Sequence, residues 1–172
     1  IGKAGVELII TFFSIVFTFF FSFTGFKLST RKIDENSELK SNNIAMSILL
    51  SSFIIGMMIF ISAVVAPANK TINFAFSLSS GQAVGIIVAI LKVLGFFIGT
   101  AIFTFFLLQM IMRLFMALYS KQDELQAIKN KNIAMAIIIG VFIVSASIIL
   151  SHGINSLLNA FISSPKVGTG LI

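Results

Sequence analysis

Residues 83–112 read AVGIIVAILKVLGFFIGTAIFTFFLLQMIM and contain a single charged side chain, that of Lys92. A helix needs about 20 mostly apolar residues to cross the roughly 30 Å hydrocarbon core of a bilayer. This run exceeds that length, and it continues through RLFMALYSKQDELQ without a Pro or a Gly. We therefore expect a spanning helix that starts near Gly81 and extends past the membrane at its C-terminal end.

Three further apolar runs are long enough to cross a membrane: Ala4 to Phe26, Ile44 to Ala66, and Ile133 to about Ile162. The second run should end before Pro67, because proline lacks a main-chain N–H and restricts the residue before it. The fourth run is expected to be interrupted at SHGIN, residues 151–155. The most polar stretch, KLSTRKIDENSELKSNN, follows the first run and is predicted to be a loop.

The composition agrees with four spanning helices. Of the 172 residues, 58% are hydrophobic and 10% are charged, and the mean hydropathy is +1.08. Soluble domains are about 25% charged. The predicted fold class is therefore all-α, an integral membrane four-helix bundle.

The sequence also excludes several kinds of chemistry. Without Cys, the chain has no disulfides, thiolate zinc sites or iron–sulfur clusters. It shows no Ser–His–Asp set, paired spanning carboxylates, phosphate-binding Gly loop or HExxH motif. The net charge of +6 comes without a continuous basic stripe, so we expect no nucleic-acid partner. The sequence predicts a protein that is not an enzyme and that holds no cofactor or metal.

The positions of the cations predict the orientation. The segments after the first and third spans hold eight of the twelve Lys and Arg residues: Lys27, Arg31, Lys32, Lys40, Arg113, Lys121, Lys129 and Lys131. The opposite side holds three: Lys3, Lys70 and Lys166. Because cytoplasmic loops are enriched in Lys and Arg, we expect Lys27 to Ser41 and Tyr119 to Lys131 to face the cytoplasm. Both termini and Pro67 to Ser80 are then outside, in a multi-pass protein of the bacterial inner (cytoplasmic) membrane.

A block of residues recurs 89 positions later in the chain. The first copy contains Lys32, Asp34, Glu35, Lys40, Asn43, Ile44, Ala45 and Met46, and the second contains Lys121, Asp123, Glu124, Lys129, Asn132, Ile133, Ala134 and Met135. The match continues into the spans, where Phe53 pairs with Phe142 and Ile54 with Ile143. We therefore expect two tandem, parallel two-helix repeats, residues 1–80 and 81–172, in one membrane domain. Such repeats predict a pseudo-two-fold axis along the membrane normal.

The repeated D-E-(x4)-K-(x2)-N-I-A-M block resembles the YjfL family, domain of unknown function 350. Members of that family carry an acidic, lysine-containing stretch followed by an Asn-x-Ala-hydrophobic-Ala helix start, in two hairpins that together cover nearly the whole chain. Ala134 to Ala136 match that pattern, Ser47 replaces the last Ala in the first copy, and Asn42 and Lys131 stand where the family usually has Gly. The resemblance implies a small inner-membrane protein and implies no biochemical activity.

Two interpretations fit Asn43 and Asn132, which lie where a polar segment becomes an apolar helix. An Asn in that position can accept hydrogen bonds from the first turn of the helix and is favoured as an N-cap, with an effect of about 1 kcal/mol. Alternatively, both Asn side chains form a cytoplasmic contact surface together with four acidic residues: Asp34, Glu35, Asp123 and Glu124.

Two charged residues fall within spans, and one pair of glycines has the spacing of a helix-packing motif. Glu7 and Lys92 are candidates for an intramembrane ion pair, within one chain or across a subunit interface, because a lone buried charge is costly in a bilayer. Snorkelling of Lys92 is the simpler alternative. Gly95 and Gly99 form G-x-x-x-G, which favours close helix packing.

These features predict a non-enzymatic membrane protein that is an oligomeric or scaffold subunit. Its expected partners are the lipid bilayer, further copies of itself and other subunits of a membrane complex. The alternative is a small ion channel or transporter subunit, which Glu7, Lys92, Gln109 and the Ser and Thr residues of the spans would serve.

Overall fold

The computed structural model describes residues 3–30, 34–78, 83–118 and 124–162. Four long helices form the bundle: α1 (Lys3–Ser29), α3 (Ile44–Leu78), α4 (Ala83–Leu118) and α6 (Ile133–Phe161). Each contains a segment that is long and apolar enough to cross a membrane. The fold is thus an all-α, multi-pass membrane bundle, as the sequence predicts.

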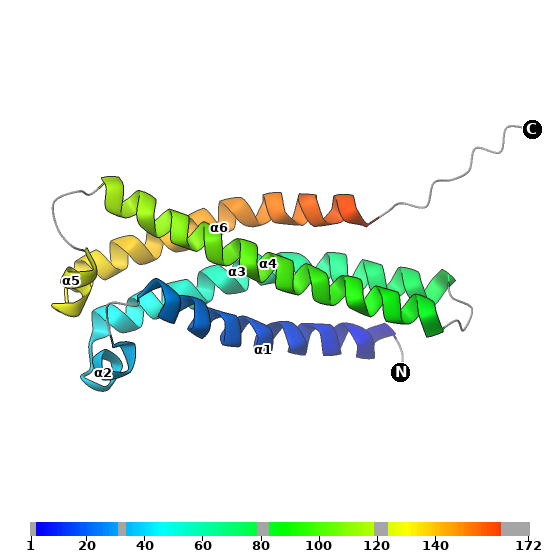
Figure 1. The fold of residues 1–172 in the computed structure, drawn as a ribbon, viewed down its shortest axis with the longest axis horizontal. Helices are drawn as coiled ribbons and strands as arrows, with labels where there is room; N and C mark the ends of the chain where they lie inside the picture. The colour runs from blue at the N-terminus through cyan, green and yellow to red at the C-terminus, as the bar shows by residue number, and fades with distance from the viewer. Residues whose placement is uncertain (1–2, 31–33, 79–82, 119–123, 163–172) are drawn as a thin grey trace, which may run out of the picture.

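Two short helices lie at one end of the bundle, α2 (Glu35–Lys40) and α5 (Glu124–Lys129) (Figure 1). The first residues of α1 and the last residues of α6 lie at the other end. Consequently α3 and α6 run in the same direction, away from α2 and α5. This arrangement places α2 with Asn43 and α5 with Asn132 at the same end of the molecule.

Helix α3 is the centre of the bundle. It packs against α6, α4 and α1, whereas α4 contacts α6 and α1 only slightly. In its most apolar segment 56% of residues are buried, against 22 to 33% in the other three long helices. A two-fold axis would match the contact between α3 and α4 with an equally extensive contact between α6 and α1. Within the described residues, α6 and α1 form no such contact. The two hairpins are therefore not packed as equivalent halves around a two-fold axis.

The polar stretch after α1 is not a simple loop, since it contains α2. Asp34 starts this helix by accepting a hydrogen bond from the Ser37 N–H at 3.3 Å. Helix α5 follows the end of α4 in the same way, so the expected extension of α4 ends at Leu118 and a separate helix starts at Glu124. The sequence prediction missed both short helices because six residues show too little periodicity to reveal a helix.

Two predicted breaks in the long helices were wrong. Helix α3 continues through Pro67 to Leu78, and α6 continues through residues 151–155 to Phe161. A proline removes one main-chain donor, and neighbouring helices and hydroxyl groups make this tolerable in a membrane span. The link between α3 and α4 is correspondingly shorter than the predicted Pro67 to Ser80.

Candidate functional surfaces

The ends of α2 and α5 share one backbone conformation. In the first copy, the N–H groups of Asn42 and Asn43 donate to carbonyls of α2, at 3.2 and 3.1 Å. In the second, the N–H groups of Lys131 and Asn132 donate to carbonyls of α5, both at 3.0 Å. Such a turn places one residue in the left-handed region.

That left-handed residue is Asn42 in the first copy, with φ of 56°, and Lys131 in the second, with φ of 63°. Glycine adopts this conformation without the steric cost that a Cβ atom brings. A glycine at either position would therefore be less strained than the residue present.

Asn43 and Asn132 both cap the helices that follow them, as predicted. The Oδ1 atom of Asn43 accepts from the Met46 N–H at 3.2 Å, and that of Asn132 from the Met135 N–H at 3.0 Å. Each bond satisfies one of the first-turn donors that have no partner inside a helix.

The amide nitrogen of Asn43 makes a second set of contacts, which joins the two halves of the chain. It donates to the Ile128 carbonyl of α5 at 3.0 Å and to the Glu38 carboxylate at 2.8 Å. Asn43 is fully buried, whereas Asn132 is exposed and has Ala127 at the position that matches Glu38. The repeated Asn residues therefore differ in role: Asn43 is part of the interior, and Asn132 lies on the surface.

The four acidic residues of the predicted contact surface are described unequally. Asp34 is exposed and caps α2. Glu35 and Glu124 start α2 and α5, but their side chains lie outside the described part, as does Asp123 altogether. The Lys131 side chain extends toward the other half and donates to the Ser41 carbonyl at 3.4 Å. This end of the molecule is thus a polar surface that both halves build.

The two charged residues of the spans occupy different surroundings. Glu7 is half-buried near the start of α1, and Lys92 is exposed on α4. No salt bridge joins them in the single chain, for which both side chains are described. Their pairing between subunits stays a prediction, and so does snorkelling of Lys92.

Polar side chains inside the bundle bind mostly to their own helices. The Thr18 hydroxyl, for example, donates to the Ser14 carbonyl at 2.7 Å. Gln109 instead crosses from α4 to α1, where its amide donates to the Ser29 hydroxyl. Ser22 and Thr104 are fully buried, and their hydroxyl oxygens have no hydrogen-bond partner in this chain. No group of three or more His, Asp or Glu side chains in the described ranges is arranged to hold a metal.

The G-x-x-x-G of α4 does not pack against another helix of the chain. A Cβ atom added at Gly95 or Gly99 would meet nothing within 4 Å. Both glycines line a groove of about 270 Å³ between α4 and the C-terminal half of α6, next to Leu157 and Phe161. The predicted close packing at these glycines therefore has no partner among the described helices.

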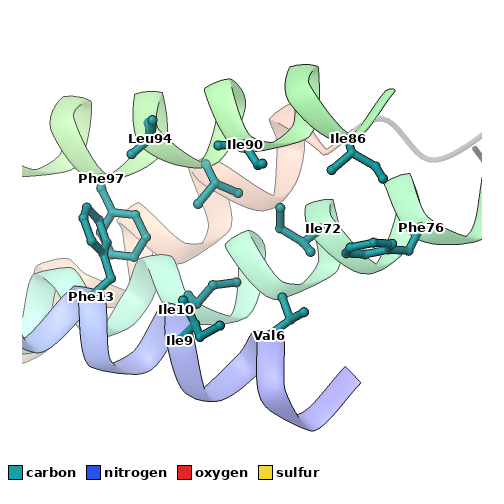
Figure 2. Close-up of a pocket in the computed structure, with 11 residues that line it drawn as sticks. Val6, Ile9, Ile10, Phe13, Ile72, Phe76, Ile86, Ile90, Leu94 and Phe97 are labelled. Atoms are coloured by element: carbon teal, nitrogen blue, oxygen red, sulfur yellow. The ribbon is translucent and has the colours of Figure 1, made fainter. Parts of the chain in front are cut away.

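A second cavity, of about 350 Å³, lies between α1, α3 and α4 and is lined by apolar side chains alone (Figure 2). Phe13 and Phe97 close one end in an edge-to-face contact, with ring centroids 5.4 Å apart. In Figure 2, Ile72 and Phe76 of α3 approach the cavity from between the other two helices. A cavity of this kind has no groups that could orient a polar substrate.

Glycines and serines hold α3 and α6 together, and the sequence prediction did not identify them. A Cβ atom at Gly140 would lie 3.2 Å from the Ser52 Cβ, and one at Gly56 would lie 2.8 Å from the Ser147 hydroxyl. Near the other end of the pair, the Lys70 ammonium donates to the Asn159 Oδ1 at 3.1 Å. Lys70 and Asn159 are 89 positions apart and so occupy matching positions of the repeat. A pairing of matching positions is the one feature of the sequence from which this contact could have been predicted.

The profile of one protein family, described as a domain of unknown function (DUF350), matches residues 3–154. The chain belongs to this family, which agrees with the resemblance seen in its sequence. No curated protein and no solved structure matches the chain.

Proposed function

We propose that this protein is a non-enzymatic subunit of a membrane assembly, which either oligomerises or anchors other subunits. The observation that supports this most is the polar end that α2, α5 and the N-termini of α3 and α6 build together. Asn43 ties the two halves at this end through a fully buried side chain. A polar surface whose backbone is already held in place is suited to binding another protein, because binding then costs less conformational entropy.

The proposed orientation places this polar end in the cytoplasm and both termini outside, in the bacterial inner membrane. It is supported by the cations on and beside the short helices, including Lys40, Lys129 and Lys131. Such residues are retained on the cytoplasmic side during insertion. We also propose that the two hairpins are tandem repeats, because α2 matches α5 and α3 matches α6 at an offset of 89 residues.

Purification in a mild detergent tests the proposed function. We expect the protein to elute as a particle larger than one chain, or with a second protein in fixed ratio. A monodisperse monomer without any co-purifying protein would contradict the proposal. The exposed pair Asn36→Ala and Lys40→Ala should then reduce recovery of a second protein, while the exposed, membrane-facing Leu91→Ala should not.

A small ion channel or transporter subunit is the second candidate. The buried hydroxyls of Ser22 and Thr104, together with Glu7 and Lys92, favour it, because ionisable and unpaired polar groups in spans often mark ion paths. Ion flux into liposomes that contain the purified protein tests this candidate. Flux that is absent, or that Glu7→Gln and Lys92→Met leave unchanged, would remove its support.

A further inference from the structure

Helices α3 and α6 match in sequence but differ in how much of the matching face is covered. On α3, Leu49, Phe60 and Ala68 are at most 1% exposed, because α4, α6 and α1 cover them. The residues 89 positions later, on α6, are Ile138, Ile149 and Leu157, which are 45, 73 and 55% exposed. The face of α6 that corresponds to the centre of the bundle is therefore not covered by any of the described helices.

The same contrast holds for α4 and α1. Phe97, Ala101 and Leu108 of α4 are fully buried. The matching residues of α1 are Leu8, Phe12 and Phe19, which are 70, 68 and 43% exposed. Helix α1 thus leaves open the face with which α4 enters the bundle.

Along most of their contact, α3 and α6 use different faces, although Lys70 and Asn159 near the C-terminal ends are matching positions. On α3 the contact includes Ser52, and on α6 it includes Gly140, which matches Ser51 of α3. Ser51 is exposed, and so is Val141, the residue of α6 that matches Ser52. An interface formed by two different faces is heterologous, and each end of it can bind a further copy.

We propose that copies of this protein assemble head to tail in the membrane. The open face of α6 in one copy binds α1 and α3 of the next copy, as α3 binds α4 and α6 within the chain. The inference rests on the proposed role as an oligomeric subunit and specifies which surfaces meet. In this arrangement α1 of the next copy lies beside α6. It therefore packs next to the groove between α4 and α6 that Gly95 and Gly99 line.

The contact pair Ser52 and Gly140 within the chain becomes Val141 and Ser51 between copies. A disulfide requires Cβ atoms about 3.5 to 4.5 Å apart, and the Cβ positions at residues 52 and 140 are 3.2 Å apart, a small adjustment from that range. The native chain has no Cys, so any disulfide that forms must involve the introduced cysteines. Four variants are oxidised in native membranes: Ser51→Cys, Val141→Cys, the double variant of both, and Ser52→Cys with Gly140→Cys.

The double variant Ser51→Cys with Val141→Cys should give a ladder of dimers and larger species. Each single variant alone should give no cross-link, and co-expressed single variants should give dimers only. The variant with Ser52→Cys and Gly140→Cys should close within one chain. Dimers from either single variant would show a two-fold interface and overturn the proposal. A closed internal pair without any ladder would overturn it too, and an oligomer found in detergent would then leave the proposed function intact.

A second measurement does not depend on cysteine geometry. Ile149→Trp adds bulk to the open face of α6, and Ile98→Trp adds the same bulk to α4, at a residue that is 47% exposed and whose match on α1, Ile9, is 57% exposed. Because this position stays uncovered in the proposed arrangement, the mass of the detergent-solubilised particle should fall to that of the single chain for Ile149→Trp and remain unchanged for Ile98→Trp. Equal masses for the two variants would contradict the assignment of this face.

Discussion

The side-chain amide of Asn43, at the start of α3, donates a 3.0 Å hydrogen bond to the main-chain carbonyl of Ile128 in α5. It is the buried contact between the two copies of the repeated block, beside the exposed bond from the Lys131 ammonium to the Ser41 carbonyl. The matching residue, Asn132, is exposed and caps its own helix. One residue type in one motif thus has a long-range role in the first half and a local role in the second.

Asn43→Ala should therefore destabilise the protein more than Asn132→Ala does. Loss of a helix cap costs about 1 kcal/mol, and loss of the two further hydrogen bonds of the Asn43 amide, to the Glu38 carboxylate and the Ile128 carbonyl, adds about 0.5 to 1.5 kcal/mol each. We expect a loss of about 1 kcal/mol for Asn132→Ala and at least twice that for Asn43→Ala, from denaturation in detergent. Equal losses would mean that the bond to Ile128 contributes nothing.

Lys131→Gly should stabilise the protein. A left-handed conformation costs a residue with a Cβ roughly 1 kcal/mol, and glycine avoids this cost. Asn42→Gly should have a smaller effect, since Asn adopts this region more readily than Lys. Lys131→Ala serves as the control, because it removes the side chain and keeps the Cβ. If Lys131→Gly is no more stable than Lys131→Ala, the backbone conformation is not the cause.

Gly140→Ala should be destabilising, by about 1 to 3 kcal/mol, because the new methyl group meets Ser52 at the contact between α3 and α6. Gly95→Ala should leave the stability of the single chain unchanged or slightly higher, since nothing lies within 4 Å of that position. Thermal denaturation of both variants in detergent compares them directly. A larger loss for Gly95→Ala would reverse the assignment of the two glycines.

The predicted ion pair between Glu7 and Lys92 is testable by a double-mutant cycle. If the two charges meet between subunits, Glu7→Gln and Lys92→Met each destabilise the oligomer more than the double variant does, because a lone charge is left unpaired. The interaction energy should be about 1 kcal/mol or more. Losses that simply add would show that Lys92 is independent of Glu7.

The orientation is testable by labelling single cysteines in whole cells. Ser37 in α2 and Ser77 near the end of α3 are both exposed and lie at opposite ends of the bundle. A membrane-impermeant thiol reagent should label Ser77→Cys and should leave Ser37→Cys unlabelled until the membrane is opened. The opposite pattern would invert the topology.

The sequence predicts the features that depend on local chemistry. The four spans follow from apolar length, and the caps at Asn43 and Asn132 follow from a polar residue before an apolar run. Pro67 was misjudged because a proline is better tolerated in a membrane-spanning helix that is packed among others than in an isolated helix, and this packing is not visible in the local sequence. The buried role of Asn43 was equally out of reach, because its partner carbonyl is 85 residues away in the sequence.

The unequal packing of the two hairpins could not be predicted from a repeat that is equal in sequence. Leu49 and Ile138 have the same position in their helices, yet one is buried and the other is 45% exposed. The difference arises because α4 and α6 of the second hairpin pack against α3, whereas no described helix packs against the matching face of α6. Sequence similarity identifies matching faces, whereas the order of the hairpins decides which faces are covered.

The number of copies in each particle extracted directly into native lipid discs, without detergent, tests the proposed function most directly. Mass measurement of these particles should show several copies of the chain, or a fixed ratio of the chain to a second protein. Particles that contain one copy and lipid alone would contradict the proposal that this protein is a subunit of a membrane assembly.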